Sequence, residues 1–216
     1  MARRSSAEPP GGPGILERLG GVLIDPEATF RAMLDGEIGV GGALITVVLI
    51  AVVEGLAVGS ILTGQLGRIG EFFAPWLSLG FQLEWFAWLA VPAAVVGLTL
   101  FSLIFWTLTS WIAHVAGRYL FGGDGSYVQI LTLTGYCWVA AMPFLAGIAL
   151  TALTGETILV TVLTIVSLAW FFTVWVTAAK VVYEIDMGRA FVASFLTPLT
   201  IYTIILFLAL RVSMVM

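Results

Sequence analysis

The sequence predicts an all-α, polytopic membrane protein with five transmembrane helices, preceded by an amphipathic interfacial helix on the cytoplasmic side. Two observations predict this fold class. Hydrophobic residues make up 60% of the chain and charged residues 10%, whereas soluble proteins carry about 25% charged residues. Apolar runs also recur through nearly the whole length after Val40, so no stretch is left for a soluble domain.

The apolar runs define the transmembrane helices. A bilayer core about 30 Å thick needs roughly 20 apolar residues of helix. Five runs meet this requirement, and they lie at about 40–63, 85–116, 128–153, 157–182 and 190–210. With their links they form a transmembrane domain at residues 36–216. The second run exceeds one perpendicular crossing, so we expect it to tilt, to bend near Pro92 or to project from the membrane.

The segment at residues 14–35 carries the amphipathic helix. Asp25 is suited to cap a helix there, and Pro26 is suited to its first position. Apolar residues such as Phe30 are mixed with charged ones, so one side can be buried while the other meets water. The sequence leaves open whether this helix rests on lipid or docks on protein. Residues 1–13 are polar and rich in Pro and Gly, and we expect a disordered tail.

Basic residues predict the orientation, because Lys and Arg are enriched on the cytoplasmic flanks of spans. A cytoplasmic N-terminus places seven basic residues on that side: Arg3, Arg4, Arg18, Arg31, Arg118, Lys180 and Arg189. Arg68 and Arg211 then fall on the other side. We therefore expect a multi-pass protein of the cell membrane, with its N-terminus cytoplasmic and its C-terminus external.

The residue content disfavours several classes of function. A net charge of −4 on a chain that mostly faces lipid disfavours nucleic-acid binding. Cys137 stands alone, cannot form an internal disulfide and is expected to be a small buried hydrophobe. The sequence has no metal-ligand cluster, Walker loop, zinc-protease motif, nucleophile elbow or dinucleotide fingerprint. We predict that the protein is not an enzyme and uses no cofactor or metal.

Glu54 is the sharpest candidate for an intramembrane polar site. It lies near the middle of the first apolar run, where an ionised carboxylate costs at least a few kcal/mol. It must therefore face protein or water, or be protonated. Two interpretations stay open: a proton or cation site inside the bundle, or a neutral carboxyl that is hydrogen-bonded to a neighbouring hydroxyl.

Small and hydroxylated residues recur at helical spacing in three runs. In the first run they form a helix-packing ridge at Ala51, Gly55, Gly59 and Thr63, which favours close contact with another helix of the same chain over dimerisation. In the last two runs hydroxyls recur at Thr157, Thr161, Thr164, Ser194, Thr197, Thr200 and Thr203. Such hydroxyls either line a polar path or, more commonly, bond backbone carbonyls or a neighbouring helix.

Three stretches resemble the prokaryotic branch of the Yip1 family. They are "RLGGVLIDPEATFRAML", "GYCWVAAMPF" in the third run and "MGRAFVASFLTPL" at the start of the fifth. The positions that carry the resemblance are Pro26, Phe30, Gly135, Tyr136, Pro143, Arg189 and Ala190. The resemblance implies five spans with a cytoplasmic N-terminus, and it implies no enzymatic activity. The Asp-Leu-Tyr-Gly-Pro motif of the eukaryotic relatives is absent, so their association with Rab-type GTPases is not carried over.

These observations predict a non-catalytic membrane adaptor or membrane-organising protein. We expect the protein to be embedded in the lipid bilayer. A membrane or cytosolic protein partner is expected to bind through residues 15–35. A homo-oligomer also stays open. The alternative is a small transporter, channel or lipid-moving protein that uses a polar path containing Glu54.

Overall fold

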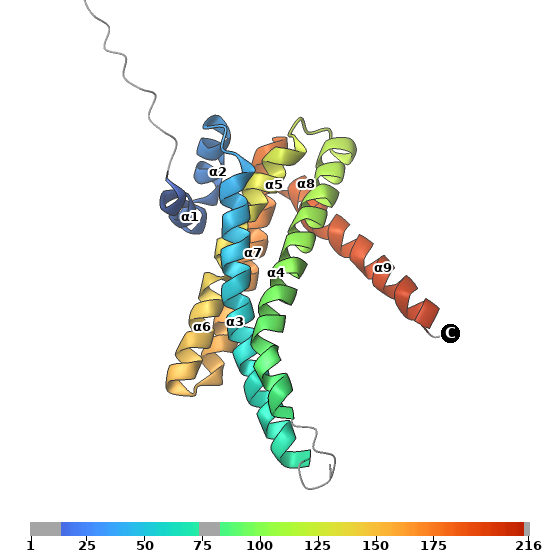
Figure 1. Ribbon diagram of the computed structural model, residues 1–216. Coiled ribbons are helices and arrows are strands. Elements are labelled where there is room, and N and C mark those ends of the chain that lie inside the picture. Colours follow the sequence, from blue (N-terminus) through green and yellow to red (C-terminus); the bar gives the residue numbers. More distant parts are fainter. Residues whose placement is uncertain (1–13, 74–82, 214–216) are drawn as a thin grey trace, which may run out of the picture.

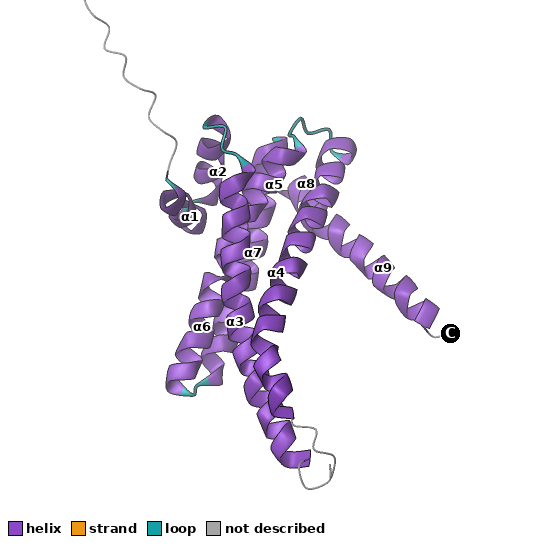
Figure 2. Cartoon of the chain, in the orientation of Figure 1, coloured by secondary structure: helices purple, strands orange, loops and turns teal. Residues whose placement is uncertain are grey.

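The computed structural model describes the backbone of residues 14–73 and 83–213. It describes the side chains of residues 14–66, 88–211 and 213. The predicted tail at residues 1–13 lies outside the described residues. Every regular element in the described ranges is helical (Figure 2). Five of these helical segments are long and apolar enough to cross a membrane: Val40–Leu66, Trp88–Leu120, Tyr127–Thr154, Thr157–Tyr183 and Met187–Arg211. The predicted all-α fold with five transmembrane helices is therefore confirmed.

Two short helices, α1 (Ile15–Ile24) and α2 (Pro26–Asp35), form a hairpin at one end of the bundle (Figure 1). Asp25 caps α2 as its sequence predicts, because the Asp25 carboxylate accepts a hydrogen bond of 3.1 Å from the backbone N–H of Ala28. The first helix was not predicted as a separate element.

The first two spans are long antiparallel helices, α3 (Val40–Phe73) and α4 (Leu83–Val115), which lie side by side (Figure 1). The helix α3 runs past its predicted end at residue 63 and continues along α4. Pro92 lies inside α4, which continues beyond it and ends in a π-helical turn, η1 (Ala116–Leu120). Membrane helices tolerate such a proline when neighbouring groups satisfy the freed carbonyl.

The third span is broken in the middle. It consists of α5 (Tyr127–Tyr136), a 3₁₀ turn η2 (Cys137–Ala141) and α6 (Met142–Thr154). Pro143 lies in the first turn of α6, where backbone N–H groups have no acceptor within the helix. The N–H of Phe144 instead donates to Ser167 Oγ of α7 (Thr157–Tyr183) at 2.8 Å. The break is thus tied to a neighbouring helix.

The fifth span also changes its helical form. It begins with α8 (Met187–Phe191), passes through a π-helical turn η3 (Val192–Leu196) and continues as α9 (Thr197–Ser213). The hydroxyl of Thr197 donates to the carbonyl of Val192 at 2.9 Å, next to Pro198. From this point α9 diverges from the other helices (Figure 1). Most of its large apolar side chains are exposed, as expected of a surface that faces lipid.

Candidate functional site

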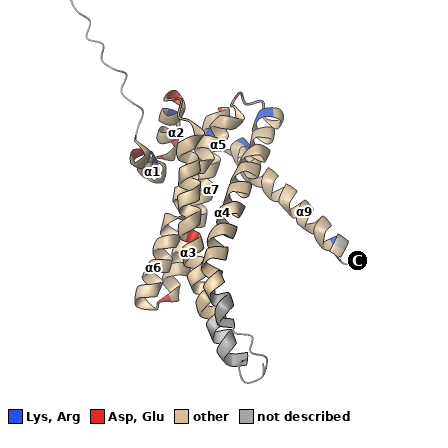
Figure 3. Ribbon diagram, in the orientation of Figure 1, with Lys and Arg blue, Asp and Glu red and all other residues tan. Residues whose placement is uncertain are grey.

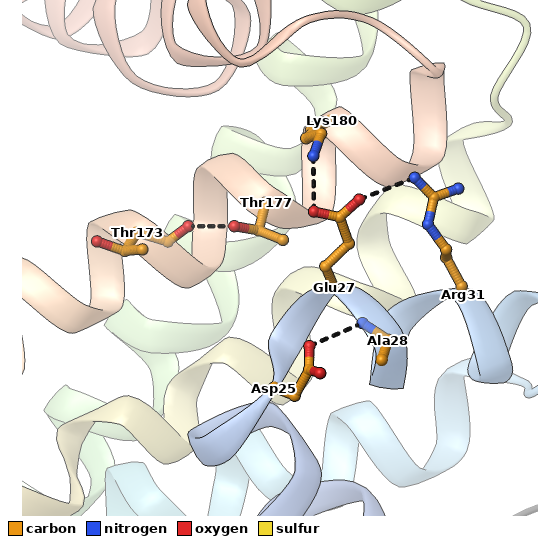
Figure 4. Close-up of polar contacts among 7 residues, drawn as sticks. All are labelled: Asp25, Glu27, Ala28, Arg31, Thr173, Thr177 and Lys180. Atoms are coloured by element: carbon orange, nitrogen blue, oxygen red, sulfur yellow. Dashed lines mark hydrogen bonds and ion pairs between the residues drawn. The ribbon is translucent and has the colours of Figure 1, made fainter.

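The α1–α2 hairpin is held to the bundle by an ion pair between distant parts of the chain. Lys180 Nζ near the end of α7 lies 2.6 Å from one carboxylate oxygen of Glu27, and Arg31 Nη2 lies 2.9 Å from the other (Figure 4). The hydrogen bond from Lys180, followed by that from Arg31, holds the pKa of Glu27 below its ordinary value of 4.5. Glu27 is therefore ionised at neutral pH.

The apolar side of the hairpin faces protein. Val22 of α1 is 0% exposed, and Phe30 and Met33 of α2 are 0% and 1% exposed. All three belong to the hydrophobic cluster that also contains Val47 of α3 and Tyr136 of α5. The open choice between lipid and protein is settled for these side chains, because a helix that lay on lipid would leave them exposed.

Tyr136 connects the hairpin to the middle of the bundle. Its side chain is completely buried, and its hydroxyl accepts a hydrogen bond of 3.0 Å from Arg18 Nη1 of α1. Gly42 lies against the same hydroxyl so closely that a Cβ there would overlap the oxygen. Gly135 is equally confined, because its Cβ would lie 2.6 Å from the Cβ of Ala43. The Gly135–Tyr136 pair thus brings α5 into close contact with α3.

An open polar groove of about 790 Å³ lies between the hairpin, the loop before α5 and the end of α7. Its charged lining residues are Arg31, Asp35, Asp124 and Glu184. None of its three carboxylates forms an ion pair with any residue that the structure describes. The groove is therefore acidic, and it is open to ligands at the polar end of the protein.

The sequence did not predict this groove, because its charged residues come from three separate segments. Two glycines of the loop before α5 keep it close to α7: a Cβ at Gly123 would lie 2.9 Å from the carbonyl oxygen of Tyr183, and one at Gly125 would overlap Val182. The Gly-rich loop was the available signal in the sequence. Glu184, which ends α7, has a left-handed φ of 52°.

Glu54 lines a second cavity, of about 310 Å³, in the membrane-spanning part of the molecule. Its carboxyl group forms no hydrogen bond or ion pair with the described residues. The structure thus gives this carboxyl no hydrogen bond to a described hydroxyl, and both interpretations of Glu54 stay predictions. Two hydroxyls do line the cavity, but Thr164 donates to the carbonyl of Val160 and Ser167 accepts from the N–H of Phe144.

The Yip1 domain family model matches residues 20–210 of the chain. The chain belongs to the Yip1 family. Searches of curated proteins and of solved structures found no match. Together with the five apolar segments, this membership makes the chain a multi-pass membrane protein of the Yip1 type.

Within this Yip1 domain, four of the seven positions that carried the family resemblance lie near one another. Pro26 begins α2, Phe30 is buried beneath it, and Gly135 and Tyr136 belong to the same buried region. The other three positions lie elsewhere: Pro143 begins α6, Ala190 is buried in α8, and Arg189 forms an exposed ion pair of 3.1 Å with Asp186. The backbone N–H of Arg189 also holds the pKa of Asp186 below its ordinary value.

The helix-packing ridge of the Yip1 domain lies against α4. A Cβ at Gly55 would lie 2.5 Å from Val95 Cα, and one at Gly59 would lie 2.6 Å from Val91 Cα. Ala51 is completely buried, and Thr63 donates to the carbonyl of Gly59. The contact lies within one chain.

The hydroxyl-bearing residues of the last two spans bond backbone carbonyls in the main. Thr161, Thr164, Ser194, Thr197, Thr200 and Thr203 each donate to a carbonyl four or five residues earlier. These bonds are the more common of the two arrangements expected for such hydroxyls.

His114 and Lys180 each contact a residue that is distant in the sequence. His114 Nδ1 lies 3.0 Å from the hydroxyl of Tyr183, and the ring of Tyr127 lies edge-on to the imidazole. Lys180 pairs with Glu27 and not with Glu184, four residues away. Among the described residues no group of three His, Cys, Asp or Glu side chains could hold a metal ion.

Proposed function

We propose that this Yip1 protein is a non-catalytic adaptor of the cell membrane that binds a cytosolic protein in the acidic groove beside the α1–α2 hairpin. The observation that carries the proposal is the groove itself: about 790 Å³, open, and lined by three carboxylates without ion-pair partners among the described residues. Such a surface is complementary to a segment rich in Lys and Arg.

The proposed orientation supports a cytosolic partner. Among the described residues, Lys and Arg side chains gather at the end of the bundle that carries the hairpin, whereas Arg211 lies on α9 (Figure 3). By the positive-inside rule this end faces the cytoplasm. The N-terminus is then cytoplasmic and the C-terminus external.

Deletion of residues 15–35 would test this proposal poorly. The hairpin covers buried side chains such as Val47 and Tyr136, so its removal would expose the core of the bundle. Loss of the partner could then result from misfolding as well as from removal of the contact.

Charge reversal in the groove gives a sharper test. We would compare the intact protein with the double variant Asp124→Lys/Glu184→Lys by mild-detergent co-purification from native membranes. Glu156→Lys is the matched control, because Glu156 is exposed in the turn between α6 and α7. We expect a partner that the intact protein and the control retain, that the groove variant loses, and that dissociates as salt rises. Equal recovery by all three proteins would contradict the proposal.

The transport alternative is favoured by one observation, the carboxyl of Glu54 in a membrane-embedded cavity. The hydroxyl stripes add no support of their own, because these hydroxyls donate to carbonyls of their own helices. If Glu54 is a coupling site, Glu54→Gln abolishes flux in liposomes. Unchanged flux would leave Glu54 without a transport role.

A further inference from the structure

The short helix α1 has an apolar side that the described part of the chain leaves exposed. Leu16 is 79% exposed and Ile24 is 85% exposed. Gly20 lies midway between them, and residues that follow one another every four positions share one side of a helix. A Cβ at Gly20 would meet no atom within 4 Å. This side would be unfavourable in water, because apolar surface is stabilised by removal from water.

Another side of α1 is covered by protein. Val22 is completely buried, and Leu19 packs against the same hydrophobic cluster. Arg18 donates to the hydroxyl of Tyr136 at 3.0 Å. These contacts hold α1 on the bundle in one rotation about its axis, so its exposed side has a defined direction.

The contact with Tyr136 indicates the depth of α1. Tyr136 lies inside the third span, Tyr127–Thr154, and the helical rise from the far end of this span is about 27 Å. A hydrocarbon core is about 30 Å thick. Glu156, in the turn after this span, marks the far boundary, because an ionised carboxylate is costly inside the core. The helix α1 therefore lies beside the bundle where the hydrocarbon core meets the head groups.

The packing of α2 turns the exposed side of α1 away from water. The side chain of Thr29 of α2 lies against Gly21, so α2 covers that side of α1. The helix α2 lies farther from the middle of the bundle than α1 (Figure 1), and its Arg31 lines the polar groove. Leu16 lies about 140° around the helix from Gly21. It therefore points away from α2 and toward the bilayer.

The charges of the hairpin indicate which part of a lipid it contacts. Glu17 and Arg18 are the charged residues of α1, and their charges cancel. The helix α2 carries Glu27 and Asp35 against Arg31. The hairpin thus presents no excess of positive charge to anionic head groups. Burial of apolar side chains is the attraction that remains.

We propose that α1 is an interfacial helix that docks on the bundle by one side and inserts Leu16 and Ile24 into the adjoining leaflet, at the boundary between acyl chains and head groups. Its partner is a lipid surface that is recognised by its apolar layer and not by head-group charge. The inference goes beyond the proposed adaptor function, because it uses α1 and not the acidic groove.

Fluorescence quenching tests this placement. Full-chain Gly20→Cys, labelled with the dye NBD, would be studied in phosphatidylcholine nanodiscs; Cys137 is completely buried and should not react. We expect quenching by 5-doxyl phosphatidylcholine and protection from aqueous iodide. Ala32→Cys is the matched control, because Ala32 is exposed on α2, and iodide should quench it more than the doxyl lipid does.

Two results at Gly20→Cys would overturn the proposal. Quenching by iodide and not by the doxyl lipid would place this side of α1 in water. Protection from both quenchers would place it against protein, such as a second copy of this chain. The groove variant Asp124→Lys/Glu184→Lys should leave the quenching unchanged, so the adaptor function and the lipid contact can fail separately.

Charge insertion then tests the two apolar side chains. In the Gly20→Cys background, Leu16→Glu/Ile24→Glu should lose most of the doxyl quenching and gain quenching by iodide, because carboxylates favour water. Ala32→Glu in the same background is the control and should change neither signal. Gel filtration and near-UV circular dichroism check that each variant is folded. Unchanged doxyl quenching in a folded Leu16→Glu/Ile24→Glu variant would overturn the role of these side chains.

The lipid composition tests what is recognised. Phosphatidylglycerol added to the nanodiscs makes their surface negative, and we expect the doxyl quenching of Gly20→Cys to stay the same. It should also be insensitive to salt, because salt screens attraction between charges and not apolar burial. Quenching that needs anionic lipid and falls as salt rises would overturn recognition through the apolar layer.

Discussion

At the residue scale, Glu27 makes the docking of the hairpin sensitive to pH. Its pKa lies below 4.5 in the folded protein because Lys180 and Arg31 stabilise the carboxylate. The undocked form therefore binds protons more readily as the pH falls. The contribution of the ion pair is fully present above pH 4.5 and is lost as the pH falls through the lowered pKa.

Spin labels would detect this loss. We would label Ala32→Cys on α2 and Glu184→Cys at the end of α7, two exposed positions, and measure the distance distribution from pH 7 downward. Cys137 is completely buried and should not react. We expect a narrow distribution at neutral pH that broadens below pH 4.5. In Glu27→Gln this change should disappear, whereas Glu17→Gln should retain it; a pH response that survives in Glu27→Gln would refute the role of Glu27.

Tyr136 and Gly42 provide a second prediction at this scale. Tyr136→Phe removes the hydrogen bond to Arg18 and should lower the free energy of unfolding by about 1 kcal/mol. Gly42→Ala should destabilise the protein more, because its Cβ overlaps the Tyr136 hydroxyl.

The double variant Gly42→Ala/Tyr136→Phe discriminates this explanation from a general loss of stability. Removing the hydroxyl makes room for the new Cβ, so the double variant should be more stable than Gly42→Ala alone in chemical denaturation. Strictly additive losses would show that the two residues do not share this contact. Tyr119→Phe, at an exposed tyrosine, is the control and should change nothing.

At the scale of elements, the contact between α3 and α4 depends on two glycines. Gly55→Ala and Gly59→Ala each place a Cβ within 2.6 Å of an α4 Cα atom, so the helices must separate. We expect each substitution to lower the free energy of unfolding by about 1–3 kcal/mol. Gly64→Ala on the same helix meets open space and should leave stability unchanged or slightly raise it. Thermal unfolding in detergent measures all three, and equal effects at the three glycines would rule out the backbone contact as the cause.

Elements with local signals were predictable from the sequence, and elements defined by distant contacts were not. Asp25 and Pro26 predicted the start of α2, and the length of the apolar runs predicted the five spans. The helix α1 has no comparable signal, because Gly20 and Gly21 within it disfavour a helix in the sequence. Val22 of α1 is buried only because the helix packs on the bundle. The segment at 14–35 was predicted to be interfacial, but its docking depends on Lys180, far away in the sequence.

The candidate sites follow the same division. Glu54 was identifiable because a carboxylate inside an apolar run is unusual in any context. Its cavity was not, because Trp138 and Ser167 reach it from helices whose neighbours the sequence does not specify. The acidic groove likewise needs Asp35, Asp124 and Glu184 to meet.

At the scale of the whole molecule, most of the charged side chains that the structure describes lie at one end. The described end that carries the hairpin holds the inter-element ion pair Glu27–Lys180 and the acidic groove, and the opposite turn between α6 and α7 has Glu156 as its charged residue (Figure 3). This asymmetry ties the adaptor proposal to orientation, because a cytosolic protein can bind the groove only if that end faces the cytoplasm.

Cysteine labelling in intact cells tests this orientation. Asp124→Cys places a thiol in the exposed loop at the hairpin end, and Glu156→Cys places one in the exposed turn at the other end. Native Cys137 is completely buried and gives no background. With the N-terminus cytoplasmic, a membrane-impermeant maleimide should label Glu156→Cys at once and Asp124→Cys only after permeabilisation. The reverse pattern would place the groove outside the cell, and a cytosolic partner could then not bind it.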